Sequence, residues 1–383
     1  MPVEIQGFCH PSYSRIREVF AEGFRVRGEI GAAVAIVRDG EPVVDLWAGH
    51  ADPARTRPWE EDTLVHVYSV TKGMTALCAH RLIERGALAL DAAVARYWPE
   101  FAQCAKGPIT VRWLLSHRAG LPALRAPLPP AALYDWDAVC EALAAAEPCV
   151  PPGQLSYHPV TFGWLVGELV RRVDGRSLGH FFREEIAEPF GVDFHIGLGP
   201  AEEKRVADIT ALEPPPELKA AFGSEASETP PLVVLAFVNP LGTGDHNSPQ
   251  HRRAEIPAIN GHGTARSLAR VYGALAHGGE IDGASLLSPA SIERARSEQA
   301  RDLDALLGAP LRLGLGYWLT QPGVPGLAFG PNPGSFGHPG AGGSIGFADP
   351  EARLGFGYVT NRMGSSLEVD PRAQALIDAL YAG

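Results

Sequence analysis

The strand patterns in this sequence lie at its two ends, with a long helical section between them. Residues 31–50 alternate between apolar and polar side chains around Asp39-Gly40, a dipeptide typical of a two-residue hairpin turn. Further strands are predicted over residues 311–319, 343–348 and 353–360. Amphipathic helices are expected over residues 12–25 and 371–381. Strands from both ends can therefore form one antiparallel sheet, covered by the two terminal helices.

The middle of the chain is predicted to be mainly helical. The expected helices cover residues 110–116, 136–146, 162–173 and 265–277. Stretches rich in Pro and Gly separate them, over residues 122–130, 148–153, 214–231 and 242–249, and interleaved apolar residues favour ordered active-site loops. The fold class expected is α+β, with an antiparallel sheet domain formed by residues 1–65 and 305–383. A large helical domain, residues 66–304, is inserted, and the active site is expected between the two domains.

Composition narrows the classes of partner. The 383 residues carry a formal net charge of −11 and show no block of basic residues, so no nucleic-acid partner is expected. Residues 1–20 lack a signal-peptide pattern and no apolar run is long enough to span a membrane, so we expect a cytoplasmic protein without membrane contact. The five cysteines follow no metal-ligand spacing, and Cys78 and Cys140 fall at helical positions typical of a core.

Ser69-Val70-Thr71-Lys72 stands at the start of a further helical pattern. Its apolar residues form one stripe: Met74, Leu77, Cys78, Leu82 and Ile83. If Ser69 opens this helix, Lys72 lies one turn away, about 5 Å along the axis. A hydroxyl at the positive end of a helix dipole, beside an amine that can take its proton, can be an activated nucleophile. The chain has only four lysines, and arginine cannot replace an amine that must lose its proton. A helix cap followed by a solvated lysine is the alternative.

Two downstream segments can complete such a site. Tyr157 lies in a turn-rich loop, residues 151–159, which leads into the helix at 162–173. A tyrosine presented there can place its phenol beside Ser69, although a tyrosine at the edge of the core is the alternative. Residues 336–344 hold many glycines at the entrance of a strand, which suits a close approach of backbone N–H groups to a ligand.

With these segments the chain resembles the superfamily of serine β-lactamases and penicillin-binding proteins, whose motifs are Ser-x-x-Lys, Tyr-x-Asn or Ser-x-Asn, and Lys-Thr-Gly. Within it, the chain is most similar to the family VIII carboxylesterases, which resemble class C β-lactamases. Ser69 to Lys72 matches the first motif fully, and Tyr157-His158-Pro159 matches the second in its Tyr. His338-Pro339-Gly340 stands in the place of Lys-Thr-Gly, where these esterases usually have His or Trp. Residues 114–122, 260–266 and 314–317 support the similarity, which spans residues 16–380.

The resemblance implies a serine carboxylesterase that acts through an acyl-enzyme and needs no cofactor. Ser69 would be the nucleophile, and Lys72 and Tyr157 would share the proton transfers, with the identity of the base left open. The N–H groups of Ser69 and Ala341 would form the oxyanion hole, with His338 and Gly340 at its rim. A β-lactamase, a peptidase or an acyltransferase using the same site is the alternative, and a non-catalytic homologue would have been expected to lose Lys72 or Tyr157.

Two departures from the family motifs favour an uncharged ester over a β-lactam. Pro159 replaces the Asn of the second motif and so has no side-chain donor for a substrate amide. His338 replaces a Lys, and a histidine of ordinary pKa is mostly neutral at pH 7. The loop residues that would line an apolar pocket for short acyl chains are Leu121, Leu124, Leu128, Leu133 and Trp136.

Two other hydrolase classes fit the sequence less well. Gly342-Gly343-Ser344-Ile345-Gly346 has the spacing of an α/β-hydrolase nucleophile elbow, but a strand pattern follows Ser344 and no histidine lies after it. A metal hydrolase would have to use pairs such as His246 with His251 or His117 with His262. No His-x-His or His-Glu-x-x-His motif occurs, so solvated histidines and no metal site are expected.

Overall fold

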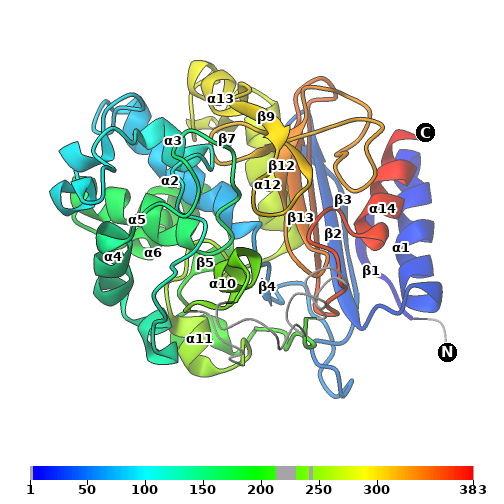
Figure 1. Cartoon of the computed structure of the whole chain (residues 1–383). Coiled ribbons are helices and arrows are strands. Elements are labelled where there is room, and N and C mark those ends of the chain that lie inside the picture. Colours follow the sequence, from blue (N-terminus) through cyan, green and yellow to red (C-terminus); the bar gives the residue numbers. More distant parts are fainter. Residues whose placement is uncertain (1–2, 213–229, 241–244, 383) are drawn as a thin grey trace.

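The computed structural model describes residues 3–212, 230–240 and 245–382. A large antiparallel sheet and a mostly helical region lie side by side, with α12 between them (Figure 1). The strands of the sheet follow the order β1-β3-β2-β14-β13-β12-β11-β10-β9. Their bounds are β1 Gln6–Cys9, β2 Gly31–Arg38, β3 Glu41–Gly49, β9 Ala300–Leu303, β10 Pro310–Leu313, β11 Trp318–Leu319, β12 Phe336–Pro339, β13 Ile345–Asp349 and β14 Leu354–Thr360. The two ends of the chain therefore share one sheet, as predicted.

The junction between the two ends of the chain is the pairing of β14 with β2. The register runs from Leu354 opposite Arg38 to Thr360 opposite Ala32. The hairpin from β2 to β3 turns at Asp39 and Gly40, whose φ angles of 54° and 85° are those that the predicted two-residue turn requires. Strand β13 pairs with β12, so the segment that ends at Pro339 lies next to the centre of the sheet.

Helices cover both faces of this sheet. Helices α1 (Ser14–Val26) and α14 (Pro371–Tyr381) pack on each other at the right of Figure 1 and share one core with the sheet. Helix α12 (Ala265–Ala276) packs on the other face, against β14, β2 and β13. Its approach requires glycine at position 355, because a Cβ there would lie 2.0 Å from the backbone nitrogen of Gly273. Helix α12 thus joins the sheet to the helical region.

The helical region surrounds helix α2 (Thr71–Glu84). The other helices are α3 Val111–Leu115, α4 Trp136–Ala145, α5 Thr161–Asp174, α6 Leu178–Phe182, α7 Glu188–Phe190, α8 Pro200–Glu203, α10 Leu232–Val238, α11 Pro249–Arg253 and α13 Pro289–Arg296. A separate three-stranded sheet has the order β4-β6-β5, and its strand β4 immediately precedes α2 in the sequence. Its strands are β4 Val65–His66, β5 Phe194–Ile196 and β6 Gly261–Gly263. β7 Glu280–Ile281 and β8 Ala284–Ser285 form a small hairpin, and short 3₁₀ or π-helical segments cover residues 11–13, 94–96, 99–102, 130–134 and 183–187.

Most predicted elements are confirmed, with three differences. Residues 311–319 form a hairpin of β10 and β11 and not one strand, because Gly316 turns the chain with a φ of 85°. Strands β1 and β9, which the sequence patterns did not indicate, extend the sheet at its two edges. Helix α2 is buried from Thr71 to His80 and not along one stripe only, since other helices and the sheet enclose it.

Two elements from residues 66–304, the segment predicted to form the helical domain, contact the large sheet: β9 is its edge strand and α12 packs on one face. The loop predicted at 214–231 lies almost wholly outside the described residues, and so does the beginning of the loop at 242–249. Cys78 and Cys140 are buried, as predicted. Within the described part of the chain, no helix has both the length and the hydropathy needed to cross a membrane.

Candidate active site

Ser69 lies in a sharp turn between β4 and α2. Tyr68, the residue before it, has a φ of 46°, a left-handed conformation that is rare for a tyrosine. The turn is held by hydrogen bonds from Thr71 N and Thr71 Oγ1 to the Tyr68 carbonyl. Ser69 is only partly buried although its neighbours on both sides are buried. The strained turn therefore presents the Ser69 side chain at the surface of a packed core.

Lys72 is enclosed next to Ser69. Its side chain has no exposed surface, and Nζ lies 3.0 Å from Ser69 Oγ. Nζ also donates to the carbonyls of Pro159 and Ala258, at 2.7 Å and 3.0 Å. Burial lowers the pKa of Lys72 well below the ordinary lysine value. A neutral amine has two N–H groups, which the two carbonyls accept, so its lone pair is left to face Ser69 Oγ.

Tyr157 lies close to both Ser69 and Lys72. Lys72 Nζ is 5.1 Å from the centre of its ring. Burial raises the pKa of the phenol, and a hydrogen bond with Ser69 offsets part of this rise. Tyr157 is therefore protonated at neutral pH. Its hydroxyl also lies 3.4 Å from Nε2 of His338, which gives the phenol proton a second acceptor.

The backbone of Tyr157 is held by residues that carry no motif. Asp304 is buried and accepts the N–H of Tyr157 at 2.5 Å and those of Leu306 and Leu307 at 2.9 Å and 2.8 Å. His117 lies against the ring, with ring centres 4.8 Å apart, and its Nδ1 accepts the N–H of His158 at 3.0 Å. The site thus depends on two residues whose roles no local sequence pattern revealed.

The glycine-rich segment after β12 passes close to Ser69. A Cβ on Gly340 would lie 2.2 Å from the carbonyl of Val67, so this approach requires glycine. The Gly340 carbonyl accepts the N–H of Gly343 at 3.1 Å, which orients the peptide between Gly340 and Ala341. Ala341 is partly exposed, and among the described residues neither its N–H nor that of Ser69 has a hydrogen-bond acceptor. Two free N–H groups are what an oxyanion hole requires.

His338 and Gly340 lie deeper than the rim positions expected from the sequence. His338 is only 1% exposed, with Nδ1 2.6 Å from the Pro339 carbonyl. Burial is the main cause that lowers the pKa of His338 well below the usual histidine value, so its ring is neutral. The N–H of Gly340 donates to the Ser344 carbonyl at 2.7 Å and is not available to a ligand. His338 therefore contacts Tyr157, and Gly340 positions Ala341.

Several other sequence-based interpretations can be judged. Ser344 is buried and followed by β13, which confirms that its glycine-flanked motif is not a nucleophile elbow. Three of the residues expected to line an acyl pocket, Leu121, Leu124 and Leu133, lie in the hydrophobic core and are at most 4% exposed, whereas Leu128 and Trp136 are partly buried against it. The expectation of solvated histidines is wrong for His251, which is 1% exposed and stacked on His246 with ring centres 4.6 Å apart.

Comparisons with known proteins identify the family of this chain. The family model described as Beta-lactamase matches residues 16–380. The chain is 40% identical to the "Esterase/beta-lactamase LipL" of Mycobacterium tuberculosis, over 96% of this chain and 85% of that protein. A solved penicillin-binding protein homologue from Caulobacter crescentus is 44% identical, with a TM-score of 0.91 and 99% of each chain covered. A solved family VIII carboxylesterase is 41% identical, with a TM-score of 0.90 and the same coverage. The resemblance found in the motifs is confirmed, and the chain belongs to the beta-lactamase family.

Proposed function

We propose that this protein is a serine carboxylesterase that hydrolyses small, uncharged esters through an acyl-enzyme on Ser69. The observation that carries the proposal is the environment of Lys72. Its buried amine donates hydrogen bonds to two backbone carbonyls, and its Nζ lies 3.0 Å from Ser69 Oγ. A neutral amine held in this way is a general base for the serine hydroxyl. The similarity to the esterase/beta-lactamase LipL and to a family VIII carboxylesterase supports the same class of reaction.

Acylation would proceed in two steps. Lys72 takes the Ser69 proton while Oγ attacks the ester carbonyl carbon, and the oxyanion is bound by the N–H groups of Ser69 and Ala341. The tetrahedral intermediate then collapses, the bond to the alcohol oxygen breaks, and the Tyr157 phenol gives its proton to that oxygen. Lys72 returns a proton to the phenol through the space vacated by the alcohol. Removing one oxyanion donor typically raises the barrier by about 2.7–4 kcal/mol.

Deacylation would reverse the proton transfers. A water molecule takes the place of the alcohol, and its oxygen attacks the acyl carbon while the Tyr157 hydroxyl takes its proton and passes its own proton to Lys72. The bond between the acyl carbon and Ser69 Oγ then breaks, Lys72 returns the proton to Oγ, and the carboxylic acid leaves. His338, as a neutral acceptor beside the Tyr157 hydroxyl, orients the phenol between these steps without adding charge.

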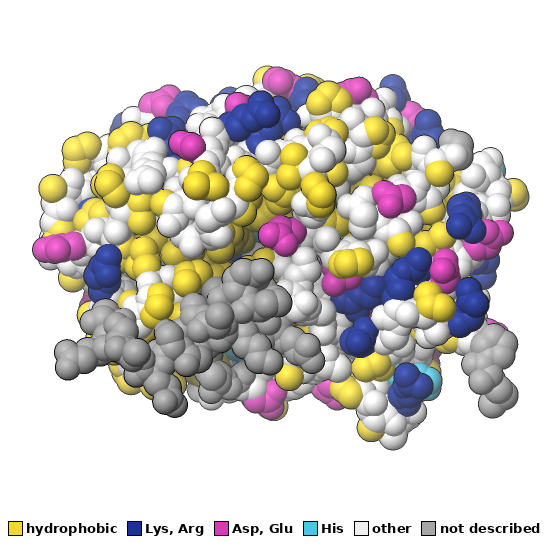
Figure 2. All heavy atoms as spheres, turned by 45° about the vertical axis from the view of Figure 1, so that its right-hand side comes forward, with side chains coloured by type: hydrophobic (Ala, Val, Ile, Leu, Met, Phe, Trp, Pro, Cys, Tyr) yellow, Lys and Arg dark blue, Asp and Glu magenta, His cyan; other side chains and the backbone are white. Residues whose placement is uncertain are grey.

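The electrostatics of the site favour an uncharged substrate. Lys72 and His338 are both buried with lowered pKa values, so neither supplies a permanent cation for a substrate carboxylate. On the face in Figure 2, Lys and Arg side chains are interspersed with Asp and Glu, which gives no basic surface for a polyanion. Among the described residues the large hydrophobic side chains that stand exposed are Phe8, Val26 and Leu303, on three separate elements. The separation of these exposed side chains supports a preference for esters of short acyl chains over emulsified lipid substrates.

A serine-reactive phosphonate tests the assignment of the nucleophile. The wild type should gain one adduct by intact mass, with the modified peptide containing Ser69. Ser69→Ala should lose the adduct and the hydrolysis of a nitrophenyl butyrate, whereas Ser344→Ala should keep both. An adduct that persists in Ser69→Ala, or activity lost only in Ser344→Ala, would overturn the proposal. Hydrolysis compared with alcoholysis at increasing alcohol concentration separates an esterase from an acyltransferase.

A further inference from the structure

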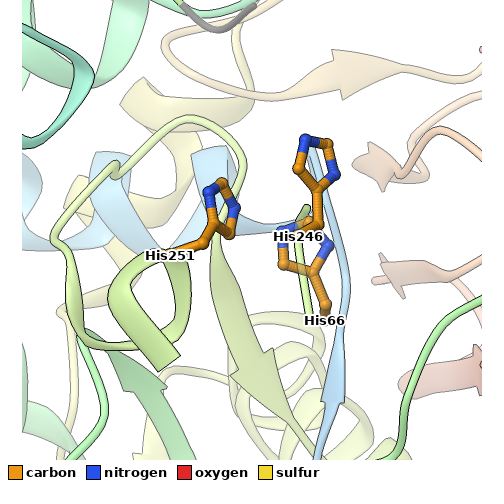
Figure 3. A group of neighbouring side chains, drawn as sticks. All are labelled: His66, His246 and His251. Atoms are coloured by element: carbon orange, nitrogen blue, oxygen red, sulfur yellow. The ribbon is translucent and has the colours of Figure 1, made fainter. Parts of the chain in front are cut away.

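Three histidines that are distant in sequence gather beside the catalytic turn. His66 ends β4, His246 lies in the loop before α11, and His251 lies within α11. Figure 3 shows the three rings side by side. One ring nitrogen from each lies within 4.8 Å of the corresponding atoms of the other two. We call these three residues the histidine cluster.

The cluster contains buried nitrogens that lack partners. His66 is 2% exposed, and within the described chain neither of its ring nitrogens has a hydrogen-bond partner. Nε2 of His251, a residue that is 1% exposed, also has no hydrogen-bond partner among the described residues. An unsatisfied buried polar group destabilises a fold by about 1–3 kcal/mol. Three such nitrogens close together therefore need an explanation other than packing.

The three rings of the cluster can act as neutral ligands, and the nearby charge of Arg252 is paired with Asp208 at 2.7 Å. Burial lowers the pKa of all three residues, to about 3 for His251, so the rings are neutral and keep a lone pair at pH 7. The Tyr68 hydroxyl lies 2.8 Å from Nδ1 of His246. When this Nδ1 carries the hydrogen, the phenol oxygen accepts it and Nε2 is left free. Metal-binding histidines commonly have an outer partner of this kind.

We propose that His66, His246 and His251 form a binding site for one divalent transition-metal ion, with Zn²⁺ the best match. Neutral imidazole is a ligand that Zn²⁺ prefers, and three histidines leave a fourth position open. Zn–N distances of about 2.0–2.1 Å require the three nitrogens to move closer together than their present spacing of up to 4.8 Å. The ring of His262, which pairs with His66 across β4 and β6, lies 5.2 Å away and borders the site.

The site would be distinct from the esterase machinery but mechanically connected to it. His66 is three residues before Ser69, and Tyr68 both bonds His246 and forms the strained turn that presents Ser69. A bound ion would tie the loop carrying His246 to β4 and to this turn. This proposal departs from the sequence-based expectation of no metal site, and it assigns the ion a structural role in stabilising the catalytic turn.

Metal titration of the full-length, chelator-treated protein tests this inference independently of esterase activity. Co²⁺ should give one equivalent of a visible ligand-field spectrum that Zn²⁺ displaces, and Zn²⁺ should raise the melting temperature. His246→Ala and His251→Ala should abolish both signals, and Tyr68→Phe, which keeps all three ligands, should weaken Zn²⁺ binding about 10- to 100-fold. His180→Ala, which alters an exposed histidine outside the cluster, is the matched control and should behave as the wild type.

Each possible result bears on the proposal. Absence of stoichiometric Co²⁺ and Zn²⁺ binding in the wild type would overturn it. So would binding that is unchanged in both His246→Ala and His251→Ala, since the metal would then lie elsewhere. His246 is only partly buried, so its alanine variant should fold, and circular dichroism checks this before titration. Loss of esterase activity in Ser69→Ala with metal binding retained would keep this inference separate from the proposed function.

Discussion

The carbonyl of Pro159 lies 2.7 Å from Nζ of Lys72. Pro159 stands where related motifs have an asparagine, and its ring offers no side-chain hydrogen-bonding group to a substrate. Its backbone nevertheless accepts one N–H of the lysine, and Ala258 accepts the other. The position that lacks the side-chain donor of the related motifs therefore helps to hold Lys72, the proposed general base.

Lys72 and Tyr157 should act as one proton-transfer unit. Lys72→Met and Tyr157→Phe are each expected to lower kcat by about 10²–10⁴-fold, as is typical for general acid–base groups. The double variant should be about as slow as either single variant, because groups that act together give non-additive losses. Rates with a nitrophenyl butyrate measure this. Single losses that multiply in the double variant would instead indicate independent roles.

The buried Lys72 should make stability depend on pH in a predictable direction. Its folded-state pKa is lowered, whereas in the unfolded chain it is about 10.4, so between these values the unfolded state holds one more proton. The free energy of unfolding should therefore rise with pH in this window, by about 1.4 kcal/mol per unit relative to Lys72→Met. Urea denaturation of both proteins at several pH values measures the difference. A constant difference would show that Lys72 stays charged.

Asp304 should be required to position Tyr157. Asp304→Asn keeps the size of the side chain but turns one acceptor into a donor facing backbone N–H groups. We expect a loss of about 1–3 kcal/mol in unfolding free energy, together with a lower kcat and little change in KM. The exposed Asp302→Asn is the matched control and should leave both quantities unchanged. An equal effect of the two substitutions would show that Asp304 does not position Tyr157.

β-Lactams should be poor substrates. The acylating groups are present, but His338 is neutral and buried, so a β-lactam carboxylate finds no cation there. We expect kcat/KM for a chromogenic cephalosporin to lie at least ~10²-fold below that for a short ester, which corresponds to about 2.7 kcal/mol. Parallel kinetics on one preparation test this. Equal efficiencies would contradict the preference for esters.

Local sequence patterns were sufficient for most of the elements, although not for the edge strands β1 and β9, and for the principal residues of the candidate site. Hairpin β2–β3 follows from alternation around Asp39-Gly40, and α14 occupies residues 371–381 as its periodicity predicts. Ser69, Lys72 and Tyr157 were recognisable because their chemistry is carried by residue types within short motifs. Periodicity and motif spacing are properties of neighbouring residues, so the sequence contains them directly.

Tertiary structure alone decided how buried each group is and what it contacts. Asp304 beneath Tyr157, the carbonyls of Pro159 and Ala258 around Lys72, and the depth of His338 all depend on segments distant in sequence. The same holds for His66, His246 and His251, which no spacing rule connects because β4 and α11 meet only in the folded chain. Burial and backbone contacts set the pKa of a side chain, and both arise only when the chain has packed.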